Sequence, residues 1–554
     1  MNTKKEYTAL TIGPIHRTLQ SVKSTKAIWS ASYMFSFLMK EMIKKIKAQN
    51  AELEFIVPHT GKVNINEKTQ NPLEEKYETG LFPDRFIIKG KIELQGIIDN
   101  VLKDFAEEVV KNSEKSVPKD VIEYIKSYLN FYHLNIELSD EKNVILEINN
   151  LLDSMELQQR VLEDAQQDYL VEFFERTAPY NFLIKSEFAE RPFSSTIEIA
   201  TAEFNENEEY QKAHVILKDI DDEKSQTKFM REIKAIVKDQ FRNYQKYIAV
   251  VQADGDNMGA FIKYLYDQKE NKEELIKRFS ENLLSFAIEA VGLIKTYNGT
   301  PIYAGGDDLL YFMPIASTVS DGNHIIVSKT LFSLISEIDN LFDVYFTKYN
   351  KDGVDFESII KNAGKKPSMS YGISISYYKY PLNQALQEGV NQLFYTAKKT
   401  EKKNAVSYVI LKHSGQYFGT TFHKDSAAYA TFTDLITTKF EKEEFIKSII
   451  RKLDPQKAVL RAIGEELNDV KRIEMIEYFF RNNFNESIHK DINEKEKLVP
   501  FLEITKQLVK DVYSEQIIKG TQEEKEKLND ENVMKIYSAL RFIEFIHNKE
   551  ERDE

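Results

Sequence analysis

Residues 247–256 read YIAVVQADGD, and residues 302–312 read IYAGGDDLLYF. The apolar run that opens the first stretch is typical of a buried strand, which here ends in acidic residues. In the second stretch, Gly305-Gly306 separates two short apolar runs and indicates a tight hairpin turn between two strands. Both stretches therefore place carboxylates where a strand meets a turn.

Strand and helix patterns alternate around these stretches, from about residue 246 to residue 411. In chain order, they predict a strand at Tyr247–Val251, a helix at Glu273–Tyr297, strands at Pro301–Ala304 and Leu309–Phe312, a helix at Ile325–Tyr349, a strand at Ser368–Tyr377, a helix at Leu382–Lys399 and a strand at Ala405–Leu411. The βαββαβ order within this series is that of a ferredoxin-like, palm-type domain. The predicted fold class is therefore α+β.

The acidic residues of the two stretches are expected to meet. In a βαββαβ sheet the first and third strands are antiparallel neighbours, so Asp254 should lie beside Asp307 and Asp308. Carboxylates that converge repel one another unless cations compensate them, so the cluster implies metal. Oxygen ligands favour Mg²⁺ or Mn²⁺, and two such ions about 4 Å apart serve in-line nucleotidyl transfer. Gly305 and Gly306 let a triphosphate approach the backbone closely.

Two further residues of this region are weaker candidates. Asp256 is a metal ligand, a group that supports the ligands, or only a turn former. Lys398, on the last helix of the unit, is either a partner for the phosphates or one of several solvated lysines. Each acidic stretch alone is also compatible with an ordinary polar turn. Their coincidence on two adjacent strands favours a functional site.

The remaining sequence contains both mixed and helical patterns. These predict a strand at Tyr7–Ile12, a helix at Leu19–Ile46, strands at Leu53–Val57 and Phe86–Ile88, a helix at Ile92–Val109, a mainly helical region at 118–174, a loop or linker at 200–225, and C-terminal helices that include Phe445–Leu453, Met475–Phe480 and Val533–Phe545. We therefore divide the chain into a first α+β domain (1–117), a mostly helical insert (118–225), the palm-type domain (226–415) and a helical C-terminal domain (416–554).

Composition narrows the function classes. The 554 residues, 42% of them hydrophobic, indicate a multidomain globular protein. No stretch resembles a membrane span or a signal peptide, so we expect a cytoplasmic protein without a membrane partner. The lack of cysteine excludes disulfides, thiolate zinc sites and a cysteine nucleophile. A net charge of −13 argues against binding nucleic acid through bulk electrostatics, and the sequence has neither a P-loop nor a zinc-type histidine pair.

Several segments together resemble the large subunit of type III CRISPR effector complexes. The matching segments are VVQADGDNMG (250–259), YAGGDD (303–308), IGPI (12–15) with WSASYMFSFL (29–38), FPDRF (82–86) and RPFSSTIEIA (191–200). The first two resemble the cyclase palm of that family, and the others are similar to its Cmr-type, or III-B, branch. Asp84 stands where the family usually has asparagine. The resemblance spans about residues 7–415.

The resemblance implies two palm domains that face each other, with nucleotide bound between them. The second palm would hold two metal ions through Asp254, Asp307 and Asp308. The first palm, which lacks the acidic turn, would help to hold the second substrate through Ser32 and Ser36. Family members convert ATP into cyclic oligoadenylate when the guide RNA of their complex pairs with a foreign target RNA. Some Cmr-type relatives adenylate S-adenosylmethionine instead.

The resemblance also implies partners and some absences. The partners would be other Cmr-type subunits, guide RNA and target RNA, with the helical C-terminal domain contacting the small subunit and the flank of the target RNA. Many relatives carry an HD nuclease domain, and many have a cysteine zinc site between the palms. Neither is expected here, because no His-Asp pair and no cysteine occurs in the sequence.

Three functions stay open on the sequence. The first is an RNA-activated nucleotidyltransferase that makes an adenylate second messenger in antiviral defence. The second is a catalytically silent scaffold of an RNA-guided complex, which the intact carboxylates disfavour. The third is a stand-alone nucleotide cyclase, which the N-terminal unit and the helical tail disfavour. The sequence does not decide between ATP and S-adenosylmethionine as the acceptor, because one sheet edge serves either.

Overall fold

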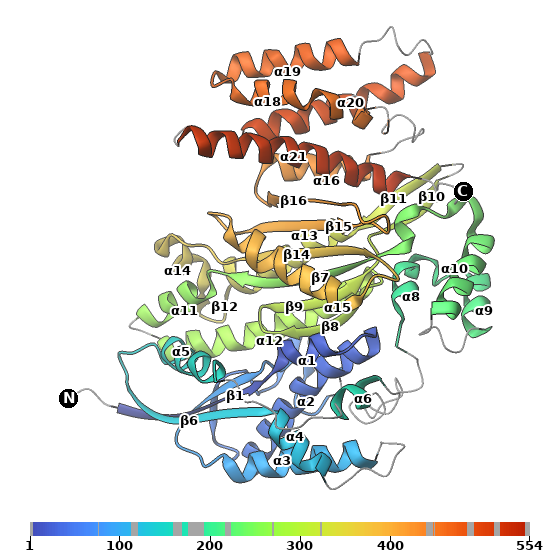
Figure 1. Cartoon of the computed structure of the whole chain (residues 1–554). Helices are drawn as coiled ribbons and strands as arrows, with labels where there is room; N and C mark the ends of the chain where they lie inside the picture. Colours follow the sequence, from blue (N-terminus) through green and yellow to red (C-terminus); the bar gives the residue numbers. More distant parts are fainter. Residues whose placement is uncertain are drawn as a thin grey trace.

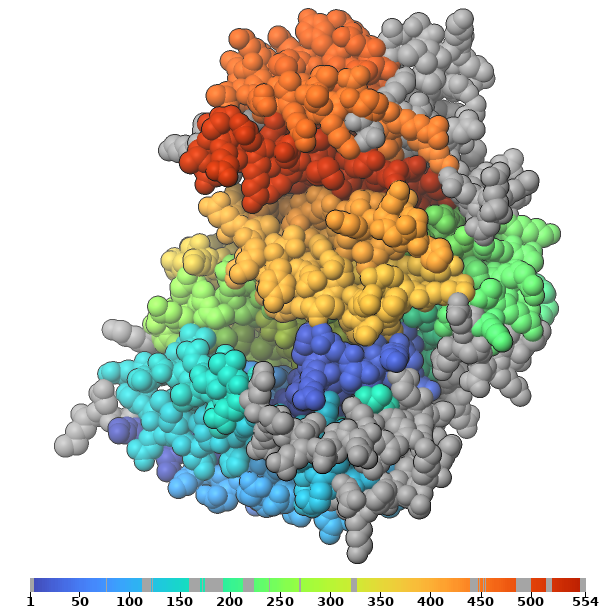
Figure 2. All heavy atoms as spheres, viewed as in Figure 1, coloured from blue at the N-terminus to red at the C-terminus, as the bar shows by residue number. Residues whose placement is uncertain are grey.

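The structure, a computed structural model, describes residues 4–75, 77–111, 120–158, 169–175, 193–216, 223–268, 271–321, 324–438, 447, 449–451, 453–484, 492–514 and 521–548. These residues form a stack of three units: the N-terminal domain, a central unit built on a six-stranded sheet, and the C-terminal helices (Figure 1). The units are in contact along the stack (Figure 2). Within the described part of the chain, no helix is both long and apolar enough to cross a membrane.

The central sheet runs in the order β16-β15-β14-β7-β9-β8. Its strands are, in chain order, β7 (Tyr247–Asp256), β8 (Thr300–Gly305), β9 (Asp308–Met313), β14 (Ser368–Tyr377), β15 (Ala405–Leu411) and β16 (Tyr417–His423). Strand β7 pairs antiparallel with β9 on one side and with β14 on the other. The two acidic stretches are thus neighbours, as their pattern predicts, and the end of β7 lies beside the β8–β9 turn.

The side chains of β7 alternate between two parts of the core. Ala249 and Val251 pack with the helices of the central unit, whereas Ile248 and Val250 pack with residues of the N-terminal domain. The helices on the first side include α11 (Met258–Asp267), α12 (Lys272–Thr296), α13 (Leu331–Phe342) and α14 (Phe356–Ala363). Because successive side chains of a strand point to opposite faces, Asp254 shares the face of Ile248 and Val250. The strand therefore directs Asp254 toward the N-terminal domain.

The prediction of a helix at Ile325–Tyr349 is wrong for the first residues of that range. A hairpin of β10 (Ala316–Asp321) and β11 (His324–Thr330) precedes α13. Residues 325–327 are the β-branched series Ile-Ile-Val, which favours a strand. Thr330 then starts the helix, because its hydroxyl accepts a hydrogen bond from the backbone N–H of Ser333.

The helix predicted at Leu382–Lys399 is present but irregular. It consists of α15 (Leu382–Val390), a π-helical turn η6 (Asn391–Thr396) and a 3₁₀ turn η7 (Ala397–Lys399). Such a change of helix type alters the direction in which the last residues point. Lys398 lies in the final turn, and its position therefore depends on this irregularity.

The N-terminal domain has a four-stranded sheet in the order β2-β5-β1-β6. Its strands are β1 (Lys4–Gly13), β2 (Glu54–Val57), β5 (Arg85–Lys89) and β6 (Asn130–Ser139), and its helices include α3 (Gln95–Lys111), α4 (Asp120–Tyr128), α5 (Val144–Glu156) and α6 (Tyr169–Glu175). The prediction that residues 118–174 are mainly helical is wrong for the ten residues of β6. Its apolar residues alternate with polar ones from Tyr132 to Leu138, which is the period of a strand, and it pairs along its length with β1.

The helix predicted at Leu19–Ile46 is divided into α1 (Ile15–Ser21) and α2 (Thr25–Gln49). The division occurs where Ser24 caps α2 by accepting a hydrogen bond from the backbone of Ala27. Helix α2 then packs against both sheets, because Phe35 lies in one core with β1 and β5 residues and with Leu310 and Phe312 of β9. This shared core fixes the N-terminal domain on the face of the central sheet that carries Asp254.

The remaining elements change two further predictions. Residues 200–225, predicted as a loop, contain α9 (Glu208–Ile216) and the start of α10 (Glu223–Val237), next to α8 (Thr196–Ala200). Strand β16 lies within the region predicted to be helical, because it pairs with β15. The C-terminal helices are α16 (Ala427–Thr437), α18 (Lys457–Glu465), α19 (Asp469–Asn483), α20 (Ile492–Ser514) and α21 (Gln522–His547). The predicted helices Met475–Phe480 and Val533–Phe545 lie in α19 and α21. In the range predicted as Phe445–Leu453, residues 445, 446, 448 and 452 lie outside the described residues, and the other five are helical.

The contact between β14 and the α15–η6 segment leads to a stability prediction. A Cβ atom at Gly372 of β14 would collide with backbone atoms of Gly389 and Leu393, which cannot move without displacing the segment. Gly372→Ala should therefore lower the free energy of unfolding by about 1–3 kcal/mol, the usual cost of overpacking. Gly389→Ala is the matched control, because its Cβ would make only ordinary contacts with Gln252. Thermal unfolding checks this, and equal midpoints for the two variants would contradict it.

Candidate functional site

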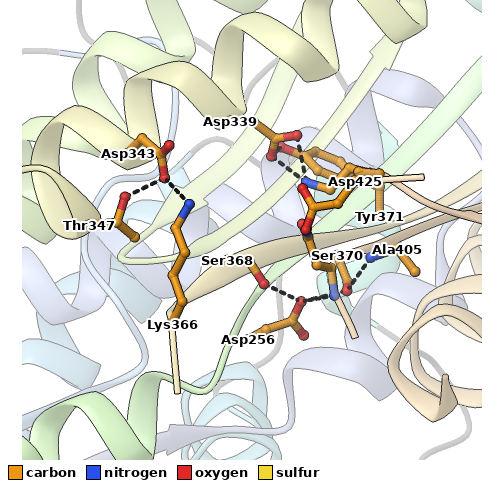
Figure 3. Close-up of polar contacts among 12 residues, drawn as sticks. Asp256, Asp339, Asp343, Thr347, Lys366, Ser368, Ser370, Tyr371, Ala405 and Asp425 are labelled. Atoms are coloured by element: carbon orange, nitrogen blue, oxygen red, sulfur yellow. Dashed lines mark hydrogen bonds and ion pairs between the residues drawn. The ribbon is translucent and has the colours of Figure 1, made fainter. Parts of the chain in front are cut away.

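Asp256 is fully buried at the end of β7. Its Oδ2 accepts hydrogen bonds from the hydroxyls of Ser368 (3.1 Å) and Ser370 (2.6 Å) and from the backbone N–H of Asn404 (2.9 Å) (Figure 3). Its Oδ1 has no hydrogen-bond partner among the described residues and lies 3.9 Å from Nζ of Lys398. Asp256 thus fastens β14 and the start of β15 to β7, and leaves one buried oxygen directed at a cation.

Lys398 sits between the carboxylates of β7. Its Nζ lies 2.5 Å from Oδ2 of Asp254 and donates a hydrogen bond to the carbonyl of Gly255 at 3.0 Å. Only 15% of the Lys398 side chain and 20% of the Asp254 side chain are exposed. The pair is therefore largely removed from water, where an ion pair with good hydrogen bonds is stronger than at the surface.

The β8–β9 turn brings Asp307 and Asp308 to the same place. Gly306 has a φ of +72°, a conformation that glycine adopts without strain. The carboxylate of Asp307 lies against Gly255, where any side chain would collide with it. Asp308 starts β9, one position beyond the Ala253–Leu309 pair of β7 and β9, and thus faces Asp254. The close approach of the two strand ends depends on the missing side chain at position 255.

The carboxylates raise one another's pKa values. Burial raises the pKa of Asp254 above its usual value, although Lys398 opposes the shift. Burial and the charge of Asp254 raise the pKa of Asp307 to about 6. For Asp308, which is exposed to the space between the domains, enclosure by the protein and the charges of Asp254 and Asp307 raise the pKa well above its usual value. One lysine does not balance this much negative charge, so the cluster favours a further cation.

A cavity of about 260 Å³ opens between the two domains beside this cluster. It is lined by Ile15, His16, Leu19, Gln20, Ser32, Phe35, Phe82, Asp84, Gln252, Ala253, Asp254, Tyr303, Asp308, Leu309, Leu310, Leu386, Gln387, Val390, Leu393 and Phe394. Most of these side chains are apolar or aromatic, and the carboxylates among them are Asp84, Asp254 and Asp308. Apolar walls with a few convergent polar groups are typical of a small-ligand site.

The serines predicted on α2 differ in position. Ser32 lines the cavity, and its Oγ lies 3.5 Å from the carbonyl oxygen of Ile302. Ser36 instead accepts a hydrogen bond from the backbone N–H of Phe82 at 2.8 Å, and it does not line the cavity. Ser36 therefore supports the turn at residues 80–82, which approaches the central sheet through a hydrogen bond from the Ala304 N–H to the Gly80 carbonyl.

A second cavity, of about 760 Å³, lies on the other side of the end of β7. The lysines in its lining are Lys365, Lys366, Lys402, Lys403 and Lys424. Figure 3 shows Lys366 beside Asp343, at 3.3 Å. Lys424 is paired with Asp339. The charge of Lys403 opposes the rise in the pKa of Asp254. Positive charge thus approaches the carboxylates from the side opposite the first cavity.

Sequence reasoning missed the cavity residues that come from elsewhere in the chain. Asp84 precedes β5, and Gln252 donates a hydrogen bond to the carbonyl of Leu386 at 3.1 Å. The replacement of the family's asparagine by Asp84 was the one available signal. Lys402 and Lys403 belong to a lysine run that resembles a solvated surface, and only the fold places it beside the site.

The carboxylates do not form a ready-made metal site. Among the described residues, no group of three acidic or histidine side chains is close enough to hold an ion. The ammonium of Lys398 contacts Asp254 and lies near Asp256, and it therefore takes part of the space that an ion would use. The structure brings Asp254, Asp256, Asp307, Asp308 and Lys398 together, but with the lysine as the neutralising cation.

Two family models match the chain. The model of the second palm domain of Cas10/Cmr2 matches residues 247–407, and the model of the N-terminal part of the CRISPR-associated protein Cmr2 matches residues 7–121. The first match covers the central sheet from β7 to the start of β15, including the acidic cluster, and the second covers β1, β2 and β5 of the N-terminal domain.

Known proteins and structures give the same result. The chain is similar to the CRISPR system Cmr subunit Cmr2 of Pyrococcus furiosus, with 28% identity over 32% of this chain and 20% of that protein. The match therefore spans about a fifth of the relative's length. The fold is similar to chains in two cryo-EM structures of type III-B Cmr-beta. The chain from the apo state has a TM-score of 0.54 and 11% sequence identity, and the match covers 92% of this chain and 82% of that chain. The chain from the state bound to cognate target RNA has a TM-score of 0.51 and 10% identity, and the match covers 91% of this chain and 83% of that chain. The chain thus contains a region that matches the Cmr2 N-terminal domain and a region that matches the second palm domain of Cas10/Cmr2, and it is similar in sequence to a Cmr2 subunit.

Proposed function

We propose that the chain is a metal-dependent nucleotidyltransferase that transfers adenylate from ATP to an acceptor hydroxyl. The observation that carries this proposal is the group of three carboxylates, Asp254, Asp307 and Asp308, at a cavity between two domains. Burial and the neighbouring carboxylates raise the pKa values of all three, and strongly shifted carboxylates in a cavity are typical of a functional site. A silent scaffold would need neither the cluster nor the cavity.

Divalent metal fits the chemistry of these residues. The donors are all carboxylate oxygens, which suit Mg²⁺ or Mn²⁺, and Oδ1 of Asp256 is a buried oxygen without a hydrogen-bond partner in the described part of the chain. Asp254, Asp307 and Asp308 would hold two ions, with Asp256 as a further ligand or support. When bound, the ions would activate the attacking hydroxyl and stabilise the negative charge that develops on the leaving pyrophosphate. Lys398 would leave Asp254 at that point.

The donor ATP would lie with its phosphates over the β8–β9 turn. Gly305 and Gly306 present backbone without side chains there, and Lys398, once released, is a cation within reach of a phosphate. Lys402 and Lys403 add positive charge on the far side of the same strand end. The apolar cavity beside Asp254 would hold the nucleoside part of a substrate.

The biological setting that we propose follows from the family. The chain would act in the cytoplasm as the large subunit of a type III-B effector complex, with other Cmr-type subunits, guide RNA and target RNA as partners. Its product would be an adenylate second messenger, with cyclic oligoadenylate as the first candidate. The similarity of its fold to Cmr-beta bound to cognate target RNA supports this setting. We expect activity only when target RNA pairs with the guide.

A second candidate product is the adenylate of S-adenosylmethionine. One observation favours it: the cavity wall that the N-terminal domain contributes carries a carboxylate, Asp84, rather than a cation for a second triphosphate. The carboxylate cluster of the central unit would serve either acceptor, so the two candidates share one catalytic site and differ only in the acceptor.

The catalytic assignment predicts that Asp307→Asn combined with Asp308→Asn abolishes product formation. Removing metal ligands costs several kcal/mol of transition-state stabilisation, so the rate should fall at least about a thousandfold. The assay uses the complex with cognate target RNA, ATP and Mn²⁺, with and without S-adenosylmethionine, and identifies products by mass spectrometry. Glu357→Gln on α14, away from the cavity, should leave the rate unchanged. Product from the double variant at the native rate would contradict the site assignment.

The position of Lys398 predicts a link between metal and stability. Lys398→Met leaves Asp254 without its partner, so unfolding should become easier by about 3 kcal/mol at neutral pH. Mn²⁺ should restore more stability to this variant than to the native chain, because the ion replaces the lost charge. Lys424→Met is the matched control, since Lys424 forms an equally buried pair with Asp339 outside the cluster. Thermal unfolding with and without Mn²⁺ measures both. Equal gains for the two variants would contradict the role given to Lys398.

A further inference from the structure

We propose that residues 77–82 of the N-terminal domain, which we call the strap, position the acidic turn of the central unit. The acidic turn is the β8–β9 turn that carries Asp307 and Asp308. By holding the end of β8 and the ring of Tyr303, the strap fixes where these carboxylates lie relative to Asp254. The effect on catalysis rests on the proposed nucleotidyltransferase function, whereas the hold on the turn does not depend on that function.

One face of α2 binds the strap from the side of the N-terminal domain. Three side chains of this helix, spaced four and three residues apart, lie on the same helix face, and each makes a hydrogen bond to the strap backbone. The bonds run from the Nε1–H of Trp29 to the carbonyl of Glu78 (2.7 Å), from the hydroxyl of Tyr33 to the carbonyl of Tyr77 (3.0 Å), and from the backbone N–H of Phe82 to the hydroxyl of Ser36 (2.8 Å). The helix therefore fixes the strap along its whole length.

On its other side, the strap is attached to the central unit. Strand β8 lies at the edge of the central sheet, next to β9. Gly80 forms a parallel bridge with Tyr303, and its carbonyl accepts a hydrogen bond from the N–H of Ala304 at 2.9 Å. The carboxylate of Glu78 pairs with the ammonium of Lys295, which lies in the last turn of α12, shortly before β8. The strap thus contacts the central unit near both ends of β8.

The absence of a side chain at Gly80 lets the strap fit between α2 and β8. A Cβ atom at this position would lie 2.9 Å from Cβ of Ser36 and 3.6 Å from Cδ2 of Tyr303. The first distance is well below the separation at which two carbon atoms attract each other. A larger residue would therefore push the strap away from the helix and change its contact with Tyr303.

Tyr303 connects the strap to the acidic turn. Its ring lies so close to Gly305 that a Cβ atom at position 305 would overlap the Tyr303 hydroxyl. The ring also lines the cavity between the domains. Burial and the charges of Asp84 and Asp308 raise the pKa of Tyr303 well above its usual value, so the hydroxyl lies near these carboxylates. A displacement of Tyr303 would thus reach the residue at which the acidic turn begins.

The acidic turn has little rigidity of its own. Gly305 and Gly306 separate the two strands, and glycine has more accessible backbone conformations than any other residue. The end of an edge strand also opens more easily than a central strand. The hydrogen bond from Ala304 to the strap lies directly before the two glycines, where it limits the movement of the turn.

Two variants weaken the strap in different ways. Gly80→Ala displaces it from α2. Tyr33→Phe combined with Ser36→Ala keeps the apolar packing of α2 and removes two of the three hydrogen bonds to the strap, so it tests the same claim if Gly80→Ala does not fold. Gly96→Ala on α3 is the matched control, because a Cβ atom there would meet nothing within 4 Å among the described residues.

Hydrogen exchange of the full chain measures the hold on the turn directly. It is read by mass spectrometry on peptides that contain residues 304–308. Both strap variants should exchange there at least about tenfold faster than the native chain, because the end of β8 opens more easily. Peptides from β14 should be unchanged, and Gly96→Ala should match the native chain throughout. Native exchange at residues 304–308 in both strap variants would overturn the proposal.

The rate of product formation tests the consequence for catalysis. In the complex with cognate target RNA, saturating ATP and Mn²⁺, Gly80→Ala should lower the rate about a hundredfold, the cost of a misplacement of about 1 Å. Excess Mn²⁺ should restore part of the rate, because the carboxylates are displaced but still present. Faster exchange at the turn with a native rate would overturn the positioning role. No product from the native complex would refute the proposed function, and the exchange measurement would still decide whether the strap holds the turn.

Discussion

The ion pair between Lys398 and Asp254 is the interaction on which the site depends. It places one ammonium among several carboxylates that face a cavity and are poorly hydrated. Burial and the charge of Asp254 raise the pKa values of Asp307 and Asp308, and one ammonium does not balance the group, so the cluster is able to accept further cations. The glycine at position 255 and the turn at Gly306 are needed for the carboxylates to come this close.

The second constraint is the shared core between the two sheets. Helix α2 packs on both, so the N-terminal domain forms the opposite wall of the cavity at which β7 ends. Each wall has its own electrostatic character. The central unit provides the carboxylate cluster, and the N-terminal domain provides Asp84, which shares the guanidinium of Arg85 with Asp153 and Glu156. The cavity is thus lined by carboxylates of both domains, Asp254 and Asp308 on one wall and Asp84 on the other.

The local sequence pattern predicted that the acidic residues of the two strands lie side by side. It did not predict the features that depend on contacts between distant parts of the chain. The adjacency of Asp254 and Asp308 follows from strand order alone, and it is observed. Strand β6 was expected to be helical, because its alternating apolar residues follow a helical stretch without a strong break. Ser36 was predicted to help hold a substrate, and only the fold shows that its hydroxyl accepts a hydrogen bond from the backbone of Phe82. The contact of Lys398 with Asp254 requires a π-helical turn that sequence does not reveal.

We propose that Asp254, Asp307 and Asp308 hold divalent metal at the cavity between the domains. Its most direct test is anomalous scattering from Mn²⁺ in crystals of the chain or its complex with a non-hydrolysable ATP analogue. We expect Mn²⁺ peaks within about 2.0–2.3 Å of oxygens of these carboxylates, with the ammonium of Lys398 moved from Asp254 to the phosphates. Well-ordered analogue with no Mn²⁺ at these residues, or with Lys398 still on Asp254, would contradict it.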